Sequence, residues 1–126
     1  MKIRLTLAAG LFAISTLTAC TGGNISSDYK KKDVHPVKIE KAKSNLIRIS
    51  YHAPAESLFY SPGVDFVNDH GVLRISIRRC SINEKCDAMA KVEVPKNESW
   101  ISKAAVPYRG EKVVMVYADT EETLIF

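Results

Sequence analysis

Residues 72–79 read VLRISIRR, a stretch in which apolar and polar side chains alternate with a period of two. One face of this stretch holds its apolar side chains, namely Leu73, Ile75 and Ile77. Such alternation is typical of a strand in a sheet with one buried face. The turn sequence Asn-Asp-His-Gly at residues 68–71 separates this strand from a second strand-like run at 64–67. We therefore predict a β-hairpin over these two runs.

Strand patterns recur on both sides of this hairpin. We predict further strands at residues 37–40, 46–51, 58–60, 88–94, 113–118 and 123–126. The run at 113–118 is apolar on both faces, as expected for a covered strand. The only helical candidate is a turn at residues 98–105, and Trp100 is expected to pack at the edge of the core. Seven or eight short strands predict an all-β fold, either a small antiparallel β-sandwich of Ig-like size or a small β-barrel.

Two of the three cysteines, Cys80 and Cys86, lie between the strands predicted at 72–79 and 88–94. In an oxidising compartment the simplest interpretation is a disulfide that closes a hairpin loop between these strands. The alternatives are a redox-active pair and half of a metal site. A redox pair is more typically separated by two residues, whereas five residues separate these cysteines.

The N-terminus carries the most specific motif in the chain. Two basic residues precede an uncharged, apolar run at residues 5–17, which is shorter than the roughly 20 residues that a membrane-spanning helix needs. This order is typical of a secretory signal peptide. The run leads into Leu17-Thr18-Ala19-Cys20, which resembles the lipobox of bacterial lipoproteins. An ordinary cleaved signal with an incidental cysteine and an uncleaved anchor are the alternatives.

The resemblance to bacterial lipoproteins implies cleavage before Cys20 and attachment of a diacylglycerol to its sulfur. It also implies, in many species, acylation of the new amino terminus, and two or more acyl chains hold a protein firmly on a membrane. In enterobacteria-like systems an Asp after the cysteine resembles an inner-membrane retention signal, whereas this chain has Thr21. We therefore expect a lipid-anchored protein of the cell envelope, at the outer membrane and facing the periplasm.

These patterns divide the chain into a signal peptide at residues 1–19, a lipidated tether at 20–35 and a β domain at 36–126. The tether is rich in Gly, Ser and Asn and includes three lysines at 30–32, so we expect it to be flexible. The lysines either contact anionic head groups or belong to a solvated spacer. No family resemblance is found for the β domain.

Composition and motifs exclude several function classes. The chain has a formal charge of +4, and two of these charges belong to the signal peptide, so nucleic acid is not expected as a partner. His35, His52 and His70 lack metal-ligand spacing, and no cofactor motif is present. The adjacent acids Glu121 and Glu122 fall at a predicted hairpin tip rather than across a cleft, so we expect no enzyme activity.

One predicted surface is locally basic. Arg74, Arg78 and Lys91 should share the outward face of the two strands that lead to the cysteine loop, and Lys85 lies in the loop itself. Such a surface suits a carboxylate-rich partner or an anionic glycan. The alternative is a solvated strand face on which charge prevents aggregation.

The sequence therefore favours a non-enzymatic envelope lipoprotein whose β domain binds a protein. It would serve as an envelope assembly component or as an inhibitor or immunity protein. A carrier of a small ligand or metal ion is the second hypothesis, and a small hydrolase is the third.

Overall fold

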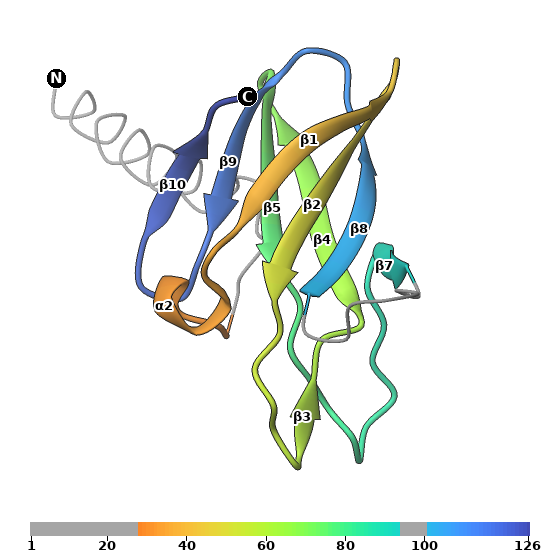
Figure 1. The fold of residues 1–126 in the computed structure, drawn as a ribbon, viewed down its shortest axis with the longest axis vertical. Helices are drawn as coiled ribbons and strands as arrows, with labels where there is room; N and C mark the ends of the chain where they lie inside the picture. The colour runs from red at the N-terminus through yellow and green to blue at the C-terminus, as the bar shows by residue number, and fades with distance from the viewer. Residues whose placement is uncertain (1–27, 94–100) are drawn as a thin grey trace, which may run out of the picture.

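One eight-stranded sheet forms most of the molecule, in the strand order β1-β2-β8-β7-β4-β5-β9-β10. The computed structural model describes residues 28–93 and 101–126. The strands of this sheet are β1 (Lys38–Lys43), β2 (Leu46–His52), β4 (Gly63–Asp69), β5 (Val72–Ile77), β7 (Ala90–Glu93), β8 (Ile101–Pro107), β9 (Lys112–Val116) and β10 (Glu121–Leu124). The sheet curls so that β1, β2 and β8 lie in front of β4, β5 and β9 (Figure 1). The all-β prediction is confirmed. The eight-stranded sheet is nearly barrel-shaped, and we refer to it below as the barrel.

The core lies inside this curled sheet. The alternation of β5 is confirmed, because Leu73, Ile75 and Ile77 are all buried. They belong to one core cluster with fully buried side chains from other strands, namely Ile47, Ile49 and Tyr51 of β2, Val106 of β8 and Met115 of the neighbouring β9. Ser76, on the opposite face of β5, is also buried.

One strand pair departs from the predicted antiparallel arrangement. Strands β5 and β9 pair in parallel, with Val72 opposite Lys112 and Ile75 opposite Met115. A parallel pair needs a long crossover connection, and residues 78–111 supply it.

The helical turn predicted at residues 98–105 is wrong over its described part, because β8 (Ile101–Pro107) is a strand. It pairs with β2 along its whole length, from His52 opposite Ile101 to Leu46 opposite Pro107. This long-range ladder, together with burial of alternate side chains, overrides the weak local pattern. The prediction for Trp100 lies outside the described residues.

The predicted boundary between tether and domain is also wrong. Tyr29 and Val34 are both buried in the core, and the Ala118 backbone N–H donates to the Tyr29 carbonyl at 2.8 Å. The short helix α2 (Lys31–Val34) connects them and lies at the end of the barrel (Figure 1). The domain therefore includes residues 28–35, because these two apolar side chains flank the lysine run and bury themselves against the barrel.

The disulfide between Cys80 and Cys86 is confirmed, with 5.8 Å between the two Cα atoms. The predicted hairpin between the flanking strands is wrong, because β4 lies between β5 and β7 and pairs with both. After β5 the chain leaves the barrel and forms β6 (Cys80–Ser81), which pairs with β3 (Phe59–Tyr60) in a separate small sheet. Residues 53–62 and 78–87 together form a projection from one end of the barrel, here named the arm (Figure 1).

Candidate functional site

Three of the four basic residues singled out from the sequence have an acidic partner. Three ion pairs form, namely Arg74–Glu121, Arg78–Asp65 at 3.3 Å and Lys91–Asp87 at 3.4 Å. Lys85 is exposed in the loop of the arm. The acids neutralise much of the expected positive surface, so a contact role for these residues stays a prediction.

The arm instead presents an apolar surface. Among the described residues six large hydrophobic side chains are exposed, and half of them lie on the arm. Leu58, Tyr60 and Ile82 have 56%, 41% and 55% of their surface exposed. Tyr60 lies opposite Cys80, and the Ile82 N–H donates to the Leu58 carbonyl at 3.0 Å, so this ladder places the three side chains on one face. We name Leu58, Tyr60 and Ile82 the apolar face of the arm.

The base of the arm is fixed by a charged and aromatic cluster. The Arg79 guanidinium donates from Nε and Nη2 to the Glu56 carboxylate at 3.2 and 2.6 Å. It also lies 3.7 Å from the centre of the Phe59 ring. A bidentate pair stacked on an aromatic ring gives the guanidinium a defined orientation, so the arm has a rigid base despite its small sheet.

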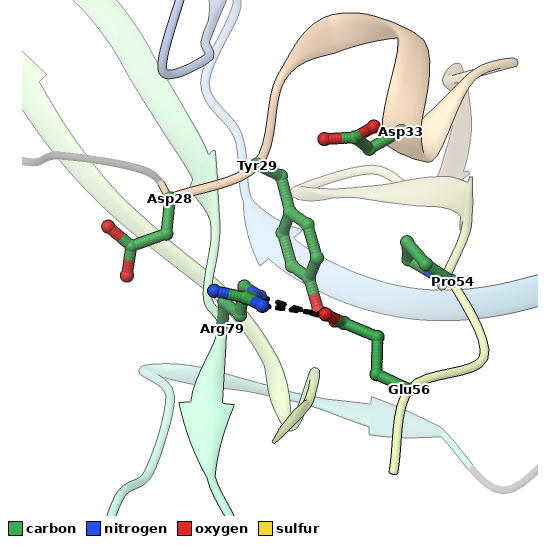
Figure 2. Close-up of a pocket in the computed structure, with 6 residues that line it drawn as sticks. All are labelled: Asp28, Tyr29, Asp33, Pro54, Glu56 and Arg79. Atoms are coloured by element: carbon green, nitrogen blue, oxygen red, sulfur yellow. Dashed lines mark hydrogen bonds and ion pairs between the residues drawn. The ribbon is translucent and has the colours of Figure 1, made fainter. Parts of the chain in front are cut away.

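The N-terminal segment closes against the same cluster. Asp28, Tyr29 and Asp33 line a cavity of about 310 Å³ together with Glu56 and Arg79, as Figure 2 shows. Burial, together with the nearby Glu56 carboxylate, raises the pKa of the Tyr29 phenol to about 12. The start of the described chain therefore lies directly at the base of the arm.

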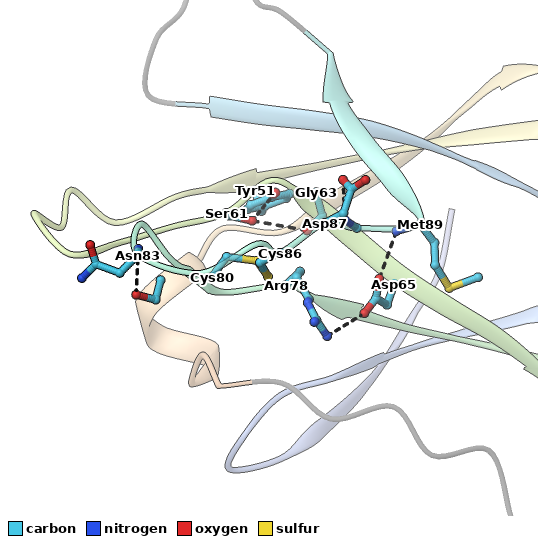
Figure 3. The surroundings of a disulfide bond; sticks show 12 residues. Tyr51, Ser61, Gly63, Asp65, Arg78, Cys80, Asn83, Cys86, Asp87 and Met89 are labelled. Atoms are coloured by element: carbon cyan, nitrogen blue, oxygen red, sulfur yellow. Dashed lines mark hydrogen bonds and ion pairs between the residues drawn. A yellow bond between two sulfur atoms is a disulfide. The ribbon is translucent and has the colours of Figure 1, made fainter.

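Further contacts join the arm to the barrel near the disulfide. The Tyr51 and Ser61 hydroxyls lie 2.7 Å apart, and the Ser61 hydroxyl donates to the Gly63 carbonyl at 3.3 Å (Figure 3). The Arg78 guanidinium of the arm donates to the Asp65 carboxylate at 3.3 Å, and the same carboxylate accepts from the N–H of Met89, the residue before β7. Both links reach β4, so β4 couples the arm to the barrel wall.

A groove opens in the barrel wall between β4 and β8. Strand β7 pairs with β4 only at Gly63 and Val64, and with β8 only through Val92 and Glu93. Within the described ranges, 28–93 and 101–126, the remainder of β4 and β8 has no strand partner on this side. The resulting groove has a volume of about 630 Å³.

The groove combines apolar and polar walls. Phe66, Leu73 and Met89 supply apolar surface, while Arg109 and Glu111 lie at its margin. The Glu111 carboxylate accepts from the Asn68 amide at 2.6 Å and from the Arg109 N–H at 2.6 Å. These hydrogen bonds lower the pKa of Glu111, although its partial burial opposes them. The margin is therefore polar and ordered, and the inner surface is apolar.

Sequence reasoning missed both features. The groove depends on how many residues of β7 pair with β4 and β8, and no local sequence pattern predicts that number. The apolar face of the arm had a weak signal, because Ile82 is an apolar residue inside a short cysteine loop.

The part of the chain that the structure describes shows neither a metal site nor a membrane-spanning helix. Its His, Cys, Asp and Glu side chains form no group of three or more that could hold a metal ion. None of its helices is long and apolar enough to cross a membrane. The lipobox-like motif lies outside these residues.

No protein-family model, curated protein or solved structure matches this chain.

Proposed function

We propose that this chain is a membrane-anchored envelope lipoprotein whose β domain is non-enzymatic and binds a protein partner in the groove between β4 and β8. The observation that carries the binding proposal is the pair of strand edges without strand partners on either side of an apolar groove. The anchor is proposed to be the lipidated Cys20, at the outer membrane and facing the periplasm. The disulfide supports export, because such bonds persist in oxidising compartments.

The groove suits an extended segment of another protein. Strand edges present unpaired N–H and C=O groups, and an added strand satisfies them by β-augmentation. The side chains of such a segment would alternate, with one set entering the apolar surface formed by Phe66, Leu73 and Met89. The same mode serves an envelope assembly component and an inhibitor or immunity protein.

Affinity capture of the lipidated protein from detergent-solubilised envelopes of its host tests this proposal. Met89→Asp places a charge in the groove, whereas Ile125→Asp changes a residue that is 91% exposed and does not line it. We expect a stoichiometric partner to be retained by Ile125→Asp and lost by Met89→Asp. A partner that both variants retain would remove the groove from the binding surface.

A small apolar ligand is the second candidate for the same groove. Its volume of about 630 Å³ lies in the range of ligand pockets, roughly 300–1,000 Å³. Mass spectrometry of the purified protein under native conditions distinguishes the two occupants. A bound small molecule that Met89→Asp releases would favour the carrier over the protein-binding function.

A further inference from the structure

We propose that the apolar face of the arm, formed by Leu58, Tyr60 and Ile82, docks on the surface of the membrane that holds the lipid anchor. This inference rests on the proposed anchoring through Cys20 and names a second contact between domain and bilayer. The groove and the arm are separate surfaces, so both can be occupied in the same molecule.

The length of chain before the described residues limits how far the arm can lie from the bilayer. Eight residue steps separate Cys20 from Asp28. Even a fully extended chain of this length spans about 30 Å at most. Asp28 lines the same cavity as Glu56 and Arg79, so this tether ends at the base of the arm. The arm and α2 lie at the same end of the barrel (Figure 1), and the tether holds this end close to the membrane.

The chemistry of the arm fits the interface between head groups and acyl chains. Leucine and isoleucine side chains gain free energy by leaving water, and a tyrosine places its ring at the head-group level. Lys30, Lys32 and Lys85 are exposed at this end and attract anionic head groups. Three acids, Glu84, Asp28 and Asp33, are also exposed at this end and offset that attraction, so the apolar face carries the contact.

Because the lipid anchor already holds the chain on the membrane, a weak contact between the apolar face and the bilayer is sufficient for docking. Burying two side chains that are each about half exposed strengthens a contact by about tenfold per side chain. Such a contact is marginal for a free protein. Once the chain is anchored, docking becomes intramolecular, and a short tether gives a high effective concentration of membrane surface.

The test uses the full lipidated chain in vesicles of phosphatidylethanolamine and phosphatidylglycerol. A benzophenone amino acid replaces Ile82 in one sample and His70 in the matched control. His70 has a side chain that is 96% exposed and lies in the turn at the opposite end of β4 from the arm. We expect phospholipid adducts at position 82 at a yield about tenfold above that at position 70, and an added Leu58→Asp to reduce that yield by about tenfold.

Three results would overturn the inference. Equal adduct yields at positions 70 and 82, or none at 82, would show that the arm does not touch lipid. Adducts between position 82 and an envelope protein in native membranes, in place of phospholipid, would make the arm a protein-binding element. Thermal unfolding of each variant is the control for folding, and we expect substitutions at these exposed positions to leave the fold intact.

Whether Cys20 is acylated is measured separately in the same samples. Metabolic labelling with palmitate, with Cys20→Ser as its control, reports acylation directly. An unlabelled chain would overturn both the proposed anchor and the docking. A labelled chain that gives no phospholipid adducts at position 82 would overturn the docking alone.

Discussion

The barrel and the arm hold their apolar residues in opposite ways. In the barrel, β2 pairs with β8 over seven residues, and Ile47 and Ile75 are completely buried. In the arm, β3 and β6 pair over two residues, and Leu58 and Ile82 remain more than half exposed. The barrel is therefore stabilised by burial of its side chains, whereas a disulfide and the Arg79 cluster hold the arm.

This difference separates stability from function. Removing an apolar side chain from water provides the main favourable free energy of folding, and exposed leucine and isoleucine side chains on the arm contribute little of it. Clusters of exposed apolar residues are typical of contact surfaces on proteins or membranes. Variants in the two regions should consequently change different properties, which the following predictions test.

The largest effect is expected inside the barrel. Ile75→Ala removes a fully buried side chain and leaves a cavity, so the free energy of unfolding should fall by about 3 kcal/mol. Urea denaturation measures this change. The control, Ile125→Ala, alters a residue that is 91% exposed, and its effect should stay within about 0.5 kcal/mol. Equal losses from both variants would contradict the distinction between buried and exposed isoleucines.

A smaller effect is expected from opening the disulfide of the arm. In the chain-entropy model a loop of this length contributes about 2 kcal/mol, which the double variant Cys80→Ser/Cys86→Ser should lose. Hydrogen exchange should accelerate first at the amide of Ile82, which bonds to Leu58 across the small sheet. The amide of Ile75 in the barrel should change only as far as global stability does. Equal acceleration at the two amides would show that arm and barrel open as one unit.

The sequence was sufficient for the parts of the barrel that have strong local patterns. Leu73, Ile75 and Ile77 alternate in a run rich in β-branched residues, and burial of one face follows from that alternation alone. The disulfide was also predictable, because two nearby cysteines have few other roles in a chain with a predicted export signal. Strand β8 was missed, since two adjacent alanines and a final proline give Ile101–Pro107 no clear period, and its ladder with β2 decides the structure.

The candidate sites could not be predicted, because they depend on long-range placement. The groove exists because β7 is shorter than the strands it joins, and the apolar face exists because β6 pairs with β3 rather than continuing β5. The side chains of Arg74, Arg78 and Lys91 lie outside the core, but their contact role stays a prediction. Some of the acidic partners, such as Glu121 beside Arg74, come from strands remote in sequence. The sequence pattern therefore could not predict that these acids neutralise the basic side chains.

The effect that is smallest at neutral pH is expected where barrel and arm meet, at Tyr29. Its pKa is raised from 10.0 to about 12, chiefly by burial. The folded state therefore favours the neutral phenol, and the unfolded chain releases this proton at lower pH. The stability that depends on the neutral phenol is complete below pH 10 and should be lost as pH rises from about 10 through about 12.

Comparison with Tyr29→Phe isolates this titration from those of the lysines and the other tyrosines. The difference in free energy of unfolding, wild type minus variant, should be constant below about pH 9. Above about pH 10 it should fall, because the wild type loses stability through this phenol whereas phenylalanine has no proton to lose. Denaturation measured at a series of alkaline pH values gives this difference. A difference that stays constant to about pH 12 would mean that water reaches the phenol. The N-terminal segment would then not seal the base of the arm, and the tether would end farther from it than Asp28 and Glu56 indicate.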